Sequence, residues 1–445
     1  MNYRAVGLFL GGTALCQPVF GGDPALPVAQ LKEVASRVSP ERLKATIDKL
    51  VSFGTRHTLS STTDEKRGIG AARRWTAQEF AAISKECGDC LTILQPSETV
   101  TAERIPQPAE IVDVLAVQLG SSEPERVLVI SGHIDSRVTD VMNSTSDAPG
   151  ANDDGSGTAA VIEAARVLSH YKFPATIVYA VLTGEEQGLQ GGKLLAKVAK
   201  EKNWQVEAQL NNDIIGNITG TSGKVDANHF RLFSEGVRVN EPSSEARNRR
   251  LRGGEVDSTS RNLARLVAEL TNATMPDFHP KMIYRADRLG RGGDQAPMQE
   301  AGYTAIRLVE SVENYNRQHQ DLRRENGIDY GDVAAGVNIP YLTNMTKVNV
   351  VALADMAWAP APLAEVKIDG AVSSDALLSW TDAKGAAGYW VRWRDTDAPA
   401  WQSQFYVTGA SKAQVKDQVV DDYSFGVAAV SPQGFVSPTT FANAK

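Results

Sequence analysis

The chain has 445 residues, of which 42% are hydrophobic and 22% are charged, and its formal net charge is −7 at pH 7. This length exceeds what one hydrophobic core usually serves, so it predicts two or three domains of ordinary globular composition. Proteins that bind nucleic acid carry a basic footprint, which this acidic balance does not provide. Beyond the N-terminal residues no stretch of about eighteen apolar residues occurs, so we expect no membrane span.

The N-terminus has the pattern of a secretory signal peptide. A single arginine precedes the short apolar run "AVGLFLGGTAL", and small and turn-forming residues follow it. We therefore expect residues 1–22 to be removed and the protein to be secreted or periplasmic. Cys16 also allows a lipoprotein, but the bulky Leu15 before it disfavours lipidation. In an exported chain, Cys87 and Cys90 are expected to form a small disulfide rather than a free or metal-binding pair.

The long region up to residue 357 predicts alternating helices and strands. Apolar residues at helical spacing predict helices over 28–55 and 64–84. Further along, the pattern predicts strands at 111–119, 126–131, 175–183, 207–216 and 304–310, and helices at 157–171, 189–202 and 332–357. The charged stretch 235–262 is expected to be a long surface excursion. This alternation predicts an α/β fold whose mostly parallel, twisted sheet is flanked by helices.

A Pro/Ala-rich linker at 358–364 separates this expected domain, residues 28–357, from a C-terminal segment of different character. Residues 365–445 hold short alternating strands such as "GYWVRWRD" and "YSFGVAAV", which are typical of a small β-sandwich. We expect Trp380 in its core and Tyr423 at the position of a tyrosine corner. The segment is similar to a fibronectin type III module.

Acidic residues and a histidine follow successive predicted strands. His133 and Asp135 come after 126–131, Glu185 and Glu186 after 175–183, and Asp213 after "AQLNN". The carboxyl ends of parallel strands share one sheet edge, where ligands bind in open α/β folds.

Further candidates precede the next helix and follow the last strand. Asp153 and Asp154 open the helix at 157–171, and His319 lies beyond the strand at 304–310. Carboxylates crowded into a cleft cannot all stay ionised without a cation, and mixed imidazole and carboxylate ligands suit zinc. Each residue alone is more often a helix cap or a solvated loop residue, but together they predict a metal-dependent hydrolase.

The segments "GHIDS", "GANDDGSG", "TGEEQGLQGG" and "NND" resemble the di-zinc aminopeptidases of the bacterial leucyl aminopeptidase type, which share their fold with animal glutaminyl cyclases. The resemblance covers roughly residues 40–357. It implies two Zn²⁺ ions per chain, with Asp153 bridging them. His133 and Asp213 would complete one site, and Glu186 and His319 the other.

The resemblance also implies two catalytic residues. Glu185 would be the general base, and Asp135 would hydrogen-bond His133 and fix its tautomer. Asp154 is expected to cap a helix rather than bind metal. Asp140 and Asp147 are expected to be loop surface.

The chain departs from the family's pattern at two places. Relatives often read Ser-Asp-His where this chain has "GGDQAP", which keeps Asp294 but replaces the histidine with Gln295. His319 stands in "HQD" rather than in the usual His-Thr-x-x-Asp. Arg288 and Arg291 near Asp294 are expected to be surface residues more than substrate contacts.

The expected substrates are peptides with a free N-terminus. Two other functions stay open: a glutaminyl cyclase-type acyltransferase on the same scaffold, and a non-catalytic binding protein with a decayed site. The presence of Glu185 argues against decay, because such a site would have no need of a proton-handling residue.

Overall fold

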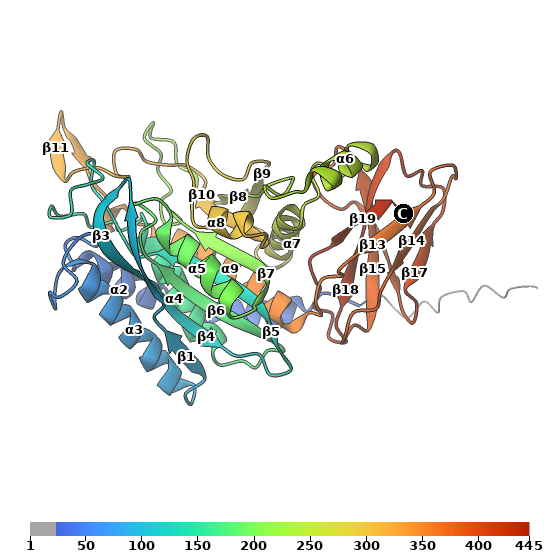
Figure 1. Cartoon of the computed structure of the whole chain (residues 1–445), viewed down its shortest axis with the longest axis horizontal. Coiled ribbons are helices and arrows are strands. Elements are labelled where there is room, and N and C mark those ends of the chain that lie inside the picture. The colour runs from blue at the N-terminus through green and yellow to red at the C-terminus, as the bar shows by residue number, and fades with distance from the viewer. Residues whose placement is uncertain (1–23, 445) are drawn as a thin grey trace, which may run out of the picture.

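The computed structural model describes residues 24–444 and places an α/β domain beside a smaller β-domain (Figure 1). The predicted signal peptide lies outside the described residues. The helices are α1 Val28–Ser36, α2 Pro40–Val51, α3 Gly68–Glu86, α4 Gly155–Leu168, α5 Gln190–Glu201, α6 Ser243–Arg252, α7 Thr259–Thr274, α8 Gln295–Glu300 and α9 Ile339–Trp358, with a 3₁₀ turn at Ala334–Gly336. None of these helices is long and apolar enough to cross a bilayer.

The α/β domain is built on an eight-stranded sheet in the order β1-β4-β6-β5-β7-β10-β8-β9. Its strands are β1 Leu91–Leu94, β4 Val114–Gln118, β5 Glu123–His133, β6 Ala175–Leu182, β7 Gln205–Asn212, β8 His229–Phe233, β9 His279–Ile283 and β10 Ala305–Glu310. The four central strands β6, β5, β7 and β10 run parallel, and β8 and β9 run parallel to each other. The pairs β1–β4, β4–β6 and β10–β8 are antiparallel. The predicted mostly parallel sheet is therefore confirmed.

Alternate residues of the central strands pack into two separate apolar cores. Leu128 and Ile130 of β5 face the core formed with α1, α2, α3, α4, α7 and α9. Val127 and Val129 face the opposite side, where α5 and α8 cover the sheet. Two small ribbons complete the domain: β2 Ser97–Ala102 with β3 Ile105–Val112, and β11 Arg323–Glu325 with β12 Ile328–Tyr330.

Residues 366–444 form the C-terminal β-sandwich. Strands β15 Gly388–Asp395, β16 Ser403–Val407 and β18 Tyr423–Val430 form one layer, and β13 Val366–Asp369, β14 Ala376–Trp380 and β17 Lys412–Val415 form the other. Strand β19 Thr440–Ala444 pairs with both β18 and β13 and joins the layers. Trp380 lies in the core of the sandwich, as predicted. No helix or strand occupies 359–365.

Several predicted boundaries were wrong for local reasons. The helix expected over 28–55 is two helices, because Ser39 caps α2 and Pro40 occupies its first turn. The strand expected at 111–119 is divided at Asp113 between β3 and β4. The helix expected from 332 starts only at Ile339, where Asn338 caps it and Pro340 lies in its first turn.

The prediction of a surface excursion over 235–262 was wrong for its last residues, from Asp257 on. Helix α6 within it is exposed, but α7 begins at Thr259 and buries Arg261 and Asn262. Charged residues there lie against the β-sandwich, a partner that the local sequence does not reveal. The Cys87–Cys90 disulfide at the end of α3 is confirmed.

Candidate metal centre and active site

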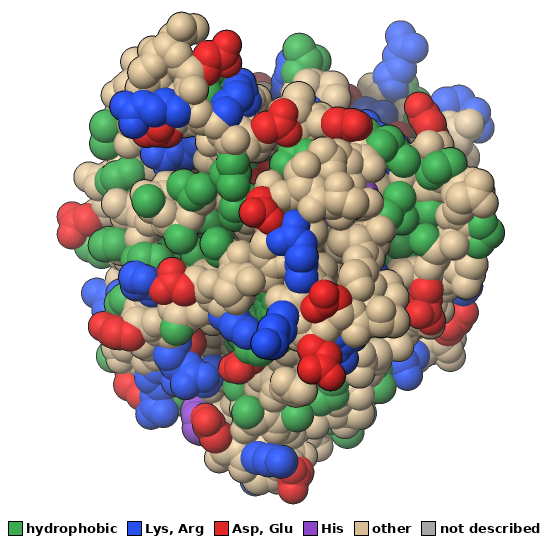
Figure 2. Space-filling model, turned by 90° about the vertical axis from the view of Figure 1, so that its left-hand side faces the viewer, with side chains coloured by type: hydrophobic (Ala, Val, Ile, Leu, Met, Phe, Trp, Pro, Cys, Tyr) green, Lys and Arg blue, Asp and Glu red, His purple; other side chains and the backbone are tan. Residues whose placement is uncertain are grey.

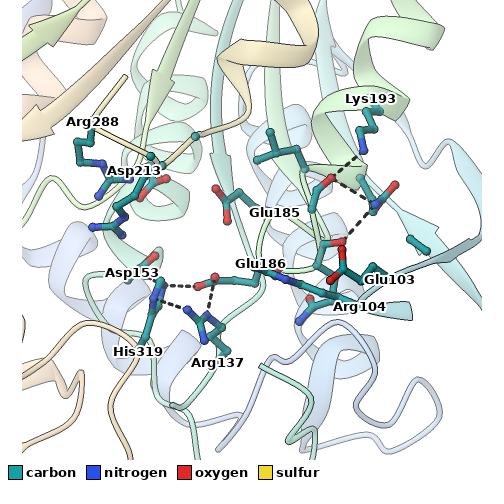
Figure 3. A pocket seen from close by; sticks show the side chains of 18 residues that line it. Glu103, Arg104, Arg137, Asp153, Glu185, Glu186, Lys193, Asp213, Arg288 and His319 are labelled. Atoms are coloured by element: carbon teal, nitrogen blue, oxygen red, sulfur yellow. Dashed lines mark hydrogen bonds and ion pairs between the residues drawn. The ribbon is translucent and has the colours of Figure 1, made fainter. Parts of the chain in front are cut away.

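The predicted site residues meet at the carboxyl edge of the parallel strands. Figure 3 shows those that line the cavity there: Asp153, Glu185, Glu186, Asp213 and His319. His133 is the last residue of β5, and Glu185 and Glu186 follow β6. Asp213 follows β7, and Asp153 lies just before α4. His319 comes from the loop after β10. The sheet topology thus brings together residues that are up to 186 positions apart in the chain.

A first group of ligand atoms comes from His133, Glu185 and Asp213, which lie within 4.8 Å of one another. His133 Nε2 is 3.9 Å from Asp213 Oδ2. The same nitrogen is 3.4 Å from Asp153 Oδ1, so Asp153 also borders this group.

A second group comes from Asp153, Glu186 and His319. His319 Nε2 lies 3.0 Å from Asp153 Oδ2 and 2.9 Å from Glu186 Oε1. Because one oxygen of Asp153 faces His133 and the other faces His319, this carboxylate lies between the two groups. That is the geometry of a bridging ligand.

The donor set fits zinc ions. Both imidazoles and all the carboxylates converge, and within residues 24–444 the buried His133 Nε2 has no hydrogen-bond partner. Burial opposes charge on the imidazoles, but the carboxylates of Glu186 and Asp153 raise the pKa of His319 to about 10. Asp135 and Asp153 likewise raise the pKa of His133 well above its ordinary value. The pocket therefore favours positive charge where nitrogen and oxygen ligands suited to Zn²⁺ point inward.

Glu185 differs from its neighbour in its surroundings. Its carboxylate points into the open cavity, whereas Glu186 is held by His319 and Arg137 (Figure 3). Burial raises the pKa of the Glu185 carboxyl well above its ordinary value, and the nearby Glu186 and Asp213 raise it further. A carboxylate in this state accepts protons readily.

Asp135 is placed mainly by its contacts with the loop after β6. Its carboxylate accepts hydrogen bonds from the backbone N–H groups of Gly184 (2.8 Å) and Glu186 (3.1 Å) and from the Thr58 hydroxyl (3.1 Å). His133 Nδ1 lies 3.1 Å from the Asp135 carbonyl oxygen and 3.5 Å from its carboxylate. The contact expected between Asp135 and His133 is thus present, but the closer acceptor is the main chain.

Asp154 caps α4, as predicted. One carboxylate oxygen accepts the N–H of Gly157 at 2.8 Å, and the other accepts the N–H of His133 at 3.0 Å. It is joined to Asp153 by a cis peptide bond. Asp154 therefore couples the start of the helix to the strand that carries a ligand histidine.

Three residues that the sequence did not single out also support the site. Arg137 donates to Glu186 Oε2 (2.9 Å) and lies 2.7 Å from His319 Nδ1. The fully buried Arg307 of β10 pairs with Asp213 Oδ2 at 2.6 Å. Asp332 accepts the N–H groups of Asn152 (2.8 Å) and Asp153 (2.7 Å), and burial raises its pKa to about 7.

The position where relatives carry histidine is occupied differently here. Gln295 donates to Asp287 at 2.6 Å, and Asp287 in turn pairs with Arg307 at 2.9 Å. Asp294 accepts the N–H of Gly192 at 3.2 Å, and burial raises its pKa to about 7. Gln295 thus supports Arg307 from behind Asp213 and is not among the residues that line the cavity.

A cavity of about 540 Å³ opens over the two metal-ligand groups. Asp153, Glu185, Glu186, Asp213 and His319 form its floor, and the loop with Arg288 and Arg291 contributes to its wall. Asp140 and Asp147 lie outside it and are exposed, as expected for loop surface.

Comparison with known proteins agrees with this geometry. The profile described as "Peptidase family M28" matches residues 113–335. A probable zinc metalloprotease of Pyricularia oryzae is 42% identical over 428 residues, which cover 93% of this chain and 84% of that protein. The chain belongs to peptidase family M28. A second relative, a probable zinc metalloprotease of Pyrenophora teres f. teres, is also 42% identical, over 94% of this chain and 88% of that protein.

Solved structures confirm the M28 fold. Legionella pneumophila LapB superposes with a TM-score of 0.55 at 19% identity, over 74% of this chain and 75% of its own. An aminopeptidase from Aneurinibacillus sp. strain AM-1 superposes with a TM-score of 0.50 at 12% identity, over 74% of this chain and 96% of its own. The predicted resemblance to this family is confirmed, whereas the likeness of the sandwich to fibronectin type III stays a prediction.

Proposed function

We propose that this M28 protein is a zinc-dependent aminopeptidase, which hydrolyses the first peptide bond of peptides with a free N-terminus. The observation that carries the proposal is the pair of three-residue ligand groups on the cavity floor, with Asp153 between them. The relatives described as zinc metalloproteases, and the aminopeptidase that shares the fold, support it.

We propose two zinc ions per chain. His133 and Asp213 would hold one, Glu186 and His319 the other, and Asp153 would bridge them. When bound, zinc supplies Lewis-acid polarisation of the scissile carbonyl and makes water a stronger nucleophile near neutral pH.

The residues around this centre then have distinct tasks. Glu185 accepts the proton of the attacking water on its carboxylate and delivers it to the nitrogen of the leaving amine. Asp135 holds the backbone of Gly184 and Glu186, and so fixes where the Glu185 carboxylate points. The Nδ1–H of His133 donates to the Asp135 carbonyl, which leaves Nε2 free to act as a ligand.

We further propose that the protein is exported. The apolar run after one arginine at the N-terminus supports this, as does the disulfide between Cys87 and Cys90. Detection of the tagged full-length chain in the culture medium or periplasm, with its N-terminus shortened, tests this proposal. Retention of the intact N-terminus inside the cell would contradict it.

Substitution Glu185→Gln tests the mechanism. Loss of the proton acceptor should lower kcat by about 10²–10⁴-fold, while the amide leaves the cavity's shape unchanged. Zinc per chain, measured by plasma mass spectrometry, should stay as in the unaltered protein. Loss of zinc would instead make Glu185 a ligand of the first group, and full activity would refute its role as a base.

An assay on aminoacyl-nitroanilides with N-blocked controls, with and without chelator, tests the activity itself. Cleavage should require the free amine and should stop when zinc is removed. Cleavage of the blocked peptides would contradict an aminopeptidase. Cyclisation of an N-terminal glutamine without hydrolysis would favour the acyltransferase alternative.

A further inference from the structure

The wall of the cavity carries several basic side chains and few apolar ones. Only two apolar side chains line it, those of Ala102 and Leu189. Five of its lining residues are basic: Arg104, Arg137, Lys193, Arg288 and Arg291. A pocket that selected leucine or phenylalanine would need an apolar lining, which these residues do not provide.

Arg288 and Arg291 are held in place from behind by one buried carboxylate. Glu313 Oε2 lies 3.2 Å from Arg288 Nη1 and 3.1 Å from Arg291 Nη1. Arg231 pairs with the other oxygen of Glu313 at 2.5 Å. Arg288 Nε also lies 3.4 Å from Asp287 Oδ1, so three guanidinium groups contact two carboxylates and the cluster keeps an excess of positive charge. Because the arginines are already ordered, binding an anion costs little side-chain entropy.

The remaining basic residues face the same space from other elements. Arg104 donates to the carbonyl of Glu186 at 2.9 Å, and Lys193 donates to the carbonyl of Gly188 at 2.9 Å. Figure 3 shows Lys193 and Arg104 across the cavity from Arg288. Elsewhere, on the face at the β11 end of the molecule, basic and acidic side chains are interspersed (Figure 2).

The acidic residues of the cavity do not offset this charge. Apart from Glu103, the lining acids are Asp153, Glu185, Glu186 and Asp213, all of them in the two ligand groups. Two divalent cations would neutralise those four carboxylates. Arg137 would stay paired with Glu186, and Arg288 and Arg291 with Glu313. Arg104 and Lys193 contact backbone carbonyls, so their charges have no ion-pair partner among the other residues that line the cavity.

We propose that this cavity binds peptides that carry a carboxylate next to the scissile bond, and that Arg288 and Arg291 recognise this carboxylate. This inference rests on the proposed aminopeptidase function and names the substrate class of that site. The carboxylate is supplied by an acidic side chain at one of the two residues that flank the cleaved bond, or by the free C-terminus of a dipeptide.

A panel of dipeptides separates these sources. Glu-Ala-amide against Gln-Ala-amide, and Ala-Glu-amide against Ala-Gln-amide, test an acidic side chain at each position with an isosteric neutral control. Ala-Ala as the free acid, against Ala-Ala-amide, tests the C-terminal carboxylate. We expect at least one charged member to exceed its neutral partner by about tenfold or more in kcat/KM, as one charge-assisted hydrogen bond to a carboxylate supplies.

Substitution assigns the preference to the arginines. Arg291→Gln leaves Glu313 paired with Arg231 and Arg288, so the fold should hold, and the charged-to-neutral ratio should fall toward one. Arg291→Lys should restore part of the ratio. The exposed Arg324, which pairs with Asp329 on the β11–β12 ribbon, provides the matched control Arg324→Gln, in which the ratio should not change.

A binding measurement decides the proposal independently of turnover. In zinc-loaded Glu185→Gln protein, calorimetry should show tighter binding of the preferred charged dipeptide than of its neutral partner. If each charged dipeptide and its neutral partner had the same kcat/KM, or if Leu-Ala-amide were preferred, this inference would be overturned. The proposed aminopeptidase activity would still stand. If none of the dipeptides were cleaved, the proposed aminopeptidase function would be refuted. Equal affinities for the charged and the neutral dipeptide in the calorimeter would overturn the inference about the arginines.

Discussion

At the scale of single residues, the position of Asp153 between two ligand groups decides how many metal ions the site can hold. Its oxygens lie 3.4 Å from His133 Nε2 and 3.0 Å from His319 Nε2. Its backbone N–H is fixed by Asp332 at 2.7 Å, so the carboxylate cannot easily turn toward one group alone. A shared ligand of this kind would make the two proposed zinc sites interdependent.

Asp153→Asn should therefore weaken both sites. An amide has one neutral oxygen acceptor in place of two anionic ones, so zinc retained after dialysis should fall from the proposed two ions per chain to one or fewer. Metal analysis of purified protein measures this. Asp140→Asn, in the exposed loop of the same segment, should retain the unaltered metal content, and an equal content in Asp153→Asn would contradict the bridge.

At the scale of elements, the site depends on how α4 is joined to β5. Asp154 accepts an N–H from the first turn of α4 and the N–H of His133 at the end of β5. It also accepts the N–H of Ile214 at 3.3 Å, next to Asp213. One buried carboxylate thus sets the relative positions of three segments that carry ligands.

Asp154→Ala should destabilise the protein by about 2–4 kcal/mol, because it removes a helix cap and leaves a buried N–H of His133 without an acceptor. Urea unfolding of metal-free protein measures this. Asp48→Ala serves as a control on α2, since its carboxylate is half exposed and pairs only with Lys44. The Asp48→Ala change should alter the free energy of unfolding by no more than about 0.5 kcal/mol. An equally small effect of Asp154→Ala would show that the cap is dispensable.

The sequence reveals those site residues that belong to a recurring pattern, an apolar run followed by an acidic residue. Asp135, Glu185, Glu186 and Asp213 each follow an apolar run, so the rule that parallel strands end at one edge is enough to bring them together. Arg137, Arg307 and Asp332 escaped prediction because each is a single charged residue without a pattern. Arg307 even lies within a strand, and only the neighbouring strand β7 places it beside Asp213.

At the scale of the whole molecule, the β-sandwich is packed firmly onto the catalytic domain. Arg394 of β15 is fully buried and pairs with Asp257 Oδ2 at 2.8 Å, and Arg265 of α7 pairs with the same carboxylate at 2.7 Å. Arg392 of β15 pairs with Glu269 of α7 at 3.0 Å. These pairs explain why Asp257, at the end of the charged stretch before α7, is buried. A charged segment can be buried when its partners come from a distant domain.

The same interface buries Asp355 of α9 completely. Burial raises the pKa of Asp355 well above its ordinary value, against smaller opposing effects of the Val436 N–H and Arg392. A carboxyl whose pKa is higher in the folded than in the unfolded chain does not reduce stability below about pH 4. As the pH rises from there toward the folded pKa, the unfolded chain releases its proton first. The free energy of unfolding then falls by up to about 1.4 kcal/mol per pH unit.

Asp355→Asn should remove this pH-dependent penalty, because the neutral amide has nearly the shape of the protonated carboxyl. Near pH 4 the variant and the unaltered protein should melt at the same temperature, and toward pH 8 the variant should melt increasingly higher. Calorimetry of metal-free protein in chelator measures the melting temperature at both pH values without a contribution from zinc. Asp397→Asn, on the exposed surface of the same sandwich, should change neither temperature by more than its error. A variant that melts lower than the unaltered protein at pH 8 would mean that Asp355 is ionised there and that the electrostatic attraction of Arg392 and the Val436 N–H outweighs its burial.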